Sequence, residues 1–110
     1  MANPRCEKCE PHYGLADIKA CFAASRFEIP RRVGRYMERQ EWTVAYLVES
    51  VGALTPGDFH KSQKHEVRAD AWLDIYRPRL DGSRLYMKFI ELDNVHGYAI
   101  LSFCRDGEAH

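Results

Sequence analysis

Residues 58–88 bring basic and phenolic side chains onto neighbouring predicted elements. Cleavage of an RNA chain through its own 2′-hydroxyl requires a group that takes that proton, cations that steady the phosphoryl oxygens, and an acid for the departing 5′-oxygen. Each acid–base group contributes about 10²–10⁴-fold to such a reaction, and aimed cations add an electrostatic contribution. The residues in this stretch that suit such a reaction without a metal ion are Lys61, Arg77, Arg79, Tyr86 and Lys88.

Lys61 and Tyr86 are the candidate catalytic residues. Lys61 can stabilise negative charge, or act as a base if burial or nearby cations lower its pKa, and Tyr86 can orient or protonate an oxygen. By position alone, a solvated surface lysine and a half-buried sheet tyrosine are the more ordinary interpretations. The candidates for RNA binding are Arg77, Arg79, Lys88, Arg105 and His60. His60 and His65 are expected at the surface.

The N-terminus carries half of a zinc site. Cys6 and Cys9 form a C-x-x-C pair, and His12 follows. Conceivable completing ligands are Cys21, Cys104 and His110. Since there is no second C-x-x-C, the favoured interpretation is a tail with two free thiols. We therefore expect no cofactor and no metal, and treat residues 1–12 as a flexible or metal-binding tail.

Length and composition indicate one globular domain over residues 1–110. The apolar fraction is 45% and the charged fraction 29%, which is unlike a disordered chain. No apolar run is long enough to span a membrane, and the N-terminus lacks the apolar stretch of a signal peptide. We therefore expect a cytoplasmic protein with no membrane partner and no disulfides. The formal net charge is zero, but local basic clusters can still hold a polyanion.

Helical spacing predicts three helices in the first half, over about residues 14–24, from Pro30 onward, and over about residues 43–54. Residues 26–29 alternate in polarity, which fits a short strand or an extended linker. Residues 55–58 suggest a new helix start, with Thr55 as cap and a proline in the first turn. We expect Phe59, His60 and Lys61 to lie on that helical turn, and the chain from residue 63 to 70 to form a loop.

From residue 71 the period changes to two, which predicts strands over about residues 71–77, 84–92 and 98–104. Asp81-Gly82 is typical of a hairpin turn. Because the connections are short, the strands should be antiparallel. Helices followed by such a sheet give an α+β fold, with N-terminal helices packed on a C-terminal antiparallel sheet.

The middle strand has two different faces. Leu85, Met87 and Phe89 should pack on the helices, whereas Tyr86 and Lys88 should point to the opposite side.

These residues resemble the MqsR family of toxins from bacterial toxin–antitoxin pairs. The matching stretches are Asp58-Phe59-x-Lys61-Ser62, Trp72-x-Asp74-x-Tyr76-Arg77-Pro78-Arg79-Leu80, Tyr86-x-Lys88 and Ser102-Phe103. The match is dense over residues 58–88 and thinner from about Pro11 to Phe103. Pro11-His12 before a helix also resembles the family's start, which argues against His12 as a zinc ligand.

The resemblance implies a RelE-like endoribonuclease that cuts mRNA without metal, an mRNA interferase, and a cognate antitoxin similar to MqsA that neutralises it. The family's site lysine falls on Lys61 and its site tyrosine on Tyr86. Whether cleavage involves association with the ribosome is left open.

Two positions depart from the family pattern. A family glutamine is replaced by Leu73, and the lysine after Ser-Phe is replaced by Cys104. Arg105 follows one place later and should therefore lie on the other strand face. These departures keep a second function open, in which a non-catalytic protein of the same fold retains antitoxin or RNA binding.

Overall fold

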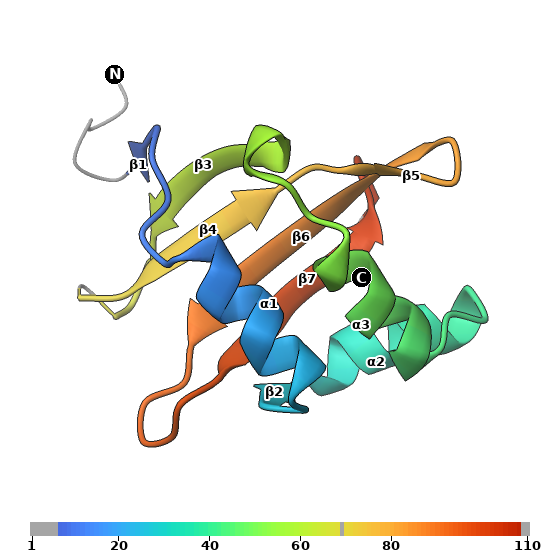
Figure 1. The fold of residues 1–110 in the computed structure, drawn as a ribbon, viewed down its shortest axis with the longest axis horizontal. Helices are drawn as coiled ribbons and strands as arrows, with labels where there is room; N and C mark the ends of the chain where they lie inside the picture. The colour runs from blue at the N-terminus through green and yellow to red at the C-terminus, as the bar shows by residue number, and fades with distance from the viewer. Residues whose placement is uncertain (1–6, 69, 109–110) are drawn as a thin grey trace.

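The computed structural model describes residues 7–68 and 70–108 (Figure 1). Within them the chain forms three α-helices, α1 (Leu15–Ala23), α2 (Arg31–Arg39) and α3 (Val44–Gly52). A 3-10 turn, Pro56–Asp58, leads into the sheet region. The strands of the described part are β1 (Glu7–Lys8), β2 (Phe27–Glu28), β3 (Phe59–Lys64), β4 (Trp72–Tyr76), β5 (Arg79–Leu80), β6 (Ser83–Glu91) and β7 (Tyr98–Arg105). The α+β prediction is confirmed. No described helix is long and apolar enough to cross a membrane.

The strands form one sheet in the order β1-β3-β4-β6-β7-β2, with β5 paired to β6. The pairs along β4, β6 and β7 are antiparallel, as predicted, and Asp81-Gly82 turns the β5–β6 hairpin with both residues at positive φ. β2 is the exception because it runs parallel to β7. It approaches β7 so closely that a Cβ on Gly97 would lie 2.6 Å from the Arg26 carbonyl oxygen.

The three helices pack on one face of the sheet, where α1 crosses in front of the strands in Figure 1. Each helix contributes two or three buried apolar side chains, and each such side chain stabilises the fold by roughly 1.5–3 kcal/mol relative to exposure. β6 meets them with Leu85, Met87 and Phe89, all at most 1% exposed. The helix contributions to this core are Ile18, Cys21, Phe22, Val33, Met37, Leu47 and Val51.

The expected helical turn at residues 59–61 is wrong. Thr55 does occupy the predicted cap position, and its amide donates to Asp58 Oδ2 at 2.8 Å. The 3-10 turn nevertheless ends at Asp58, because pairing with β4 satisfies the backbone from Phe59 onward. His60 and Lys61 therefore lie on a strand, which continues to Lys64 where a loop was expected.

Asp74 ties the N-terminal segment to the sheet. Its carboxylate is fully buried and accepts hydrogen bonds from Ser62 Oγ at 2.7 Å, from the Tyr13 amide at 2.9 Å and from the His12 amide at 3.0 Å. These bonds bring the chain before α1 alongside β3, where β1 pairs in the register Glu7 with Gln63. β1 thus becomes the edge strand beside β3 (Figure 1).

Candidate active site

A β-bulge in β3 decides where Lys61 points. Phe59 pairs with Tyr76, and Lys61 pairs with Ile75, so His60 is the extra residue. In a regular strand Phe59 and Lys61 would share a face. The bulge instead leaves Phe59 on the helix side, with its ring centroid 5.4 Å from that of Tyr76. Lys61 turns to the side away from the helices, which we call the open face.

The register across the sheet places both site lysines in one row on the open face. Lys61 pairs with Ile75, and Ile75 pairs with Lys88. Directly paired residues point to the same face, and strands lie about 4.8 Å apart, so the two lysine backbones flank β4 at a distance that their side chains can bridge. Tyr86 shares this face two residues before Lys88, whose Nζ lies 5.7 Å from the Tyr86 ring centroid.

Burial and nearby charges shift the pKa values of Tyr86 and Lys88 in opposite directions. Burial raises the pKa of Tyr86, although the charges of Lys61 and Arg77 act against that rise. The phenol therefore stays protonated at neutral pH and can donate a proton. Burial, with the charges of Arg32 and Lys61, lowers the pKa of Lys88. Lys88 consequently loses its proton at a lower pH than a free lysine would.

His60 lies at the edge of the same group. Partial desolvation lowers its pKa below 6.5, and the charges of Arg77 and Lys61 lower it further. A histidine with a lowered pKa is neutral at pH 7 and offers one ring nitrogen as a proton acceptor. The bulge residue thus differs chemically from the cations around it.

Arg77 and Arg79 extend the basic surface beyond β4. Arg77 donates to Asp106 Oδ2 from Nε at 3.1 Å and from Nη2 at 2.5 Å, and its side chain is about one-third exposed. Arg79 is exposed and pairs with Arg84, which shares a face with Tyr86 by alternation along β6. Asp106 and Arg84 were not assigned to the site from the sequence. Asp106 joins it through its ion pair with Arg77, and Arg84 through the strand pairing of β5 with β6.

A pocket of about 290 Å³ opens on the open face beside Lys88. Leu73 and Leu101 form its apolar wall, and Gln63 and Lys64 approach from β3. Arg32 reaches it from α2, and its Nη2 donates to the Leu101 carbonyl at 3.1 Å. Because Arg32 lies far from Lys88 along the chain, nothing in the sequence linked it to the site.

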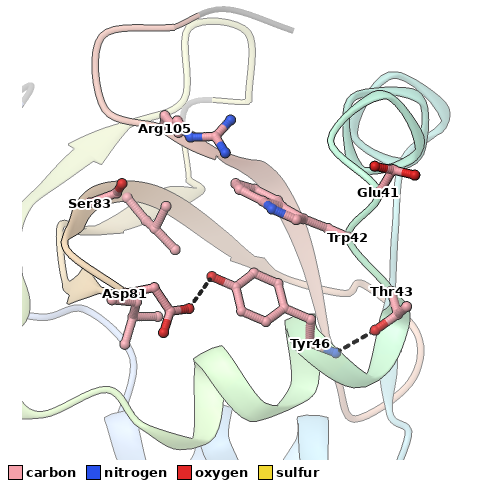
Figure 2. A pocket seen from close by; sticks show the side chains of 9 residues that line it. Glu41, Trp42, Thr43, Tyr46, Asp81, Ser83 and Arg105 are labelled. Atoms are coloured by element: carbon pink, nitrogen blue, oxygen red, sulfur yellow. Dashed lines mark hydrogen bonds between the residues drawn. The ribbon is translucent and has the colours of Figure 1, made fainter.

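Arg105 does not join this group. It pairs with Leu85 and therefore lies on the helix side, as its offset from the family pattern predicted. Its Nη1 donates to Gln40 Oε1, and its guanidinium lies 5.2 Å from the Trp42 ring centroid. Figure 2 shows it at a separate pocket that Tyr46 also lines. This pocket has a volume of about 330 Å³. Cys104 instead pairs with Tyr86 and shares its face.

The candidate metal ligands of the N-terminus are not gathered where the structure describes them. Cys9 is a free, exposed thiol, and His12 Nδ1 lies 2.9 Å from Lys8 Nζ. Cys6 lies outside the described residues. Over residues 7–68 and 70–108, Asp17, Cys21 and His96 alone form a group of three potential ligands, and their Asp17 carboxylate is already hydrogen-bonded to the Tyr98 hydroxyl at 2.6 Å.

Comparison with known proteins adds an independent observation. A family model described as "Motility quorum-sensing regulator, toxin of MqsA" matches residues 10–105. The mRNA interferase toxin MqsR of Escherichia coli (strain K12) is 27% identical over 97 residues, which cover 88% of this chain and 96% of that relative. Lys61, Tyr86 and Lys88 lie within the matched residues, whereas β1 precedes those that the family model matches.

Proposed function

Because the chain belongs to the MqsR toxin family, we propose that it is an mRNA interferase that cuts mRNA without a metal ion. The observation that carries the proposal is the convergence of Lys61, Tyr86 and Lys88 on the open face. The relative from Escherichia coli is named an mRNA interferase, and this face holds the cations and the acid that such a reaction needs.

The geometry supports a division of roles. Lys61 and Lys88 flank the phosphate and stabilise the charge that grows on its oxygens. Neutral His60 accepts the 2′-hydroxyl proton, the 2′-oxygen forms a bond to phosphorus, and the bond from phosphorus to the 5′-oxygen breaks. Protonated Tyr86 gives its proton to that leaving oxygen. The products are a 2′,3′-cyclic phosphate and a free 5′-hydroxyl.

We also propose that a cognate antitoxin neutralises the protein, because the family description names it a toxin of MqsA. Co-expression with that antitoxin should restore growth to cells that express the toxin and should yield a complex that survives purification. Growth arrest that persists with a folded antitoxin present would count against this pairing.

The cleavage proposal is tested on a defined single-stranded RNA in the presence of EDTA. Lys61→Ala and Tyr86→Phe should each lower the cleavage rate by about 10²-fold or more, because each removes a group that acts on the reacting atoms. Tyr46→Phe serves as the control, because Tyr46 packs against the core on the helix side of the sheet, and it should cut at the wild-type rate. Wild-type rates in both site variants, or cutting that EDTA abolishes, would contradict the proposal.

A second candidate is a non-catalytic protein of the same fold that keeps RNA or antitoxin binding. Leu73 favours it, because this side chain is 8% exposed and packs with Ala71, Ile90 and Ala99. The position therefore offers RNA no hydrogen-bonding group. RNA that binds but stays intact, together with cutting gained by Leu73→Gln, would identify this alternative.

A further inference from the structure

The candidate catalytic lysine, Lys61, forms an ion pair with a carboxylate of the same chain. Glu7 Oε2 lies 2.6 Å from Lys61 Nζ, and the two side chains are 47% and 32% exposed. The register of β1 with β3 fixes this contact, because Glu7 pairs with Gln63. Gln63 lies two residues beyond Lys61 on the same face, so Glu7 and Lys61 are diagonal neighbours across the two strands.

The segment that carries Glu7 is held at two further points. Lys8 Nζ lies 4.3 Å from the Trp72 ring centroid and 2.9 Å from His12 Nδ1. The backbone of His12 is in turn bonded to the buried Asp74. Glu7 is therefore delivered to Lys61 by a strand, and the contact is more than a chance meeting of two flexible side chains.

β1 places a carboxylate on the side of Lys61 that faces away from Tyr86 and Lys88. β1 lies on the outer side of β3, whereas Tyr86 and Lys88 lie two strands away in the other direction. The ion pair thus holds the Lys61 ammonium beside the edge strand and offsets part of its charge. An RNA phosphodiester carries the same single negative charge as the carboxylate, so both compete for one ammonium group.

We propose that Glu7 competes with the RNA phosphate for Lys61, so that β1 holds the site in a state of reduced affinity for RNA. This inference rests on the proposed RNA substrate and adds a residue that the family model does not cover. The competition is reversible, because an exposed ion pair and a two-residue edge strand are weakly held.

The test measures binding apart from cleavage, with a 2′-O-methyl oligoribonucleotide that lacks the attacking hydroxyl. Glu7→Gln should tighten its Kd by about 1.5-fold to fivefold, the range of an exposed ion pair. Glu10→Gln is the matched control, because it makes the same charge change on an exposed residue of the same segment and should leave Kd unchanged. In a Lys61→Ala background the gain from Glu7→Gln should disappear.

Three outcomes would overturn the inference: equal Kd values for the two glutamate variants, weaker binding by Glu7→Gln, or a gain that persists without Lys61. A parallel cleavage assay separates this from failure of the proposed function. If Glu7→Gln binds more tightly but no variant cuts RNA, the competition stands and the proposed enzyme fails. If the wild type cuts RNA but Glu7→Gln gains no affinity, the enzyme stands and the competition fails.

Discussion

The positive charge of Lys88 is disfavoured in the free protein but should become favourable when RNA is bound. Its half-buried position lowers its pKa, and the charges of Arg32 and Lys61 also disfavour its protonated form. A phosphate placed among the three would reverse that penalty, because an opposite charge within a few ångströms favours the protonated amine. The cost of holding these cations together is thus offset when RNA is bound.

This arrangement predicts the alkaline limit of RNA binding. Because the pKa of Lys88 is lowered from 10.5, affinity for the 2′-O-methyl oligonucleotide should fall before an ordinary lysine would lose its proton. Lys88→Arg keeps its charge over this range and should move the fall to higher pH. Measuring Kd from about pH 7 to about pH 10 checks this, since Tyr86, with its raised pKa, stays protonated for longer. An identical fall in both proteins would contradict the prediction.

Among the elements, the helices and the β4–β6–β7 meander could be predicted from the sequence, because the apolar period changes where the structure changes. β3 could not. The cap formed by Thr55 and Asp58 is real, but the structure after a cap depends on whether a neighbouring strand offers pairing, and that partner lies later in the chain. The faces of Tyr86 and Lys88 were predicted correctly, since β6 alternates regularly over those positions.

The candidate site was less accessible to prediction. Lys61 was placed on the wrong kind of element. Glu7, which pairs with Lys61, and Arg32, which lines the pocket beside Lys88, were not assigned to the site. Both reach the open face through long-range contacts, one by strand pairing and the other by a bond to a backbone carbonyl. No local pattern records such contacts.

Asp74 on β4 anchors the segment before α1 to the sheet. Asp74→Ala should lower the free energy of unfolding by about 2–4 kcal/mol, because it leaves the buried Ser62 hydroxyl and the partly buried amides of His12 and Tyr13 without their charged acceptor. Asp70→Ala removes an exposed carboxylate from the neighbouring loop and should change stability by less than about 0.5 kcal/mol. Denaturant titration of both variants measures the difference, and equal midpoints would show that Asp74 is no anchor.

For the molecule as a whole, a formal net charge of zero conceals a separation of charges. The open face gathers Lys61, Lys88, Arg77 and Arg84, whereas two acids that face this group, Glu7 and Asp106, are each engaged by one of its cations. Long-range attraction of RNA should therefore be weak, while close contact remains favourable.

This separation predicts the salt dependence of RNA binding. If about four phosphates are contacted, the slope of log K against log salt concentration should be about −3 for a single strand. Arg84→Gln should make the slope less steep by about 0.7. Lys19→Gln, on α1 at the helix side of the sheet, should leave the slope unchanged. A slope near zero would indicate that the basic face does not hold the phosphates.

Because of the bulge, His60 is an extra residue in β3 that has no paired residue in β4. Loss of one residue from a regular strand exchanges its inner and outer sides from that point on. Loss of His60 would instead preserve the two faces, because Phe59 would still pair with Tyr76 and Lys61 with Ile75. A shorter chain would therefore keep its lysine outside and lose only the proton acceptor. Chain length at this point can thus vary between related proteins without turning the strand over, and such variation would alter the chemistry before it altered the fold.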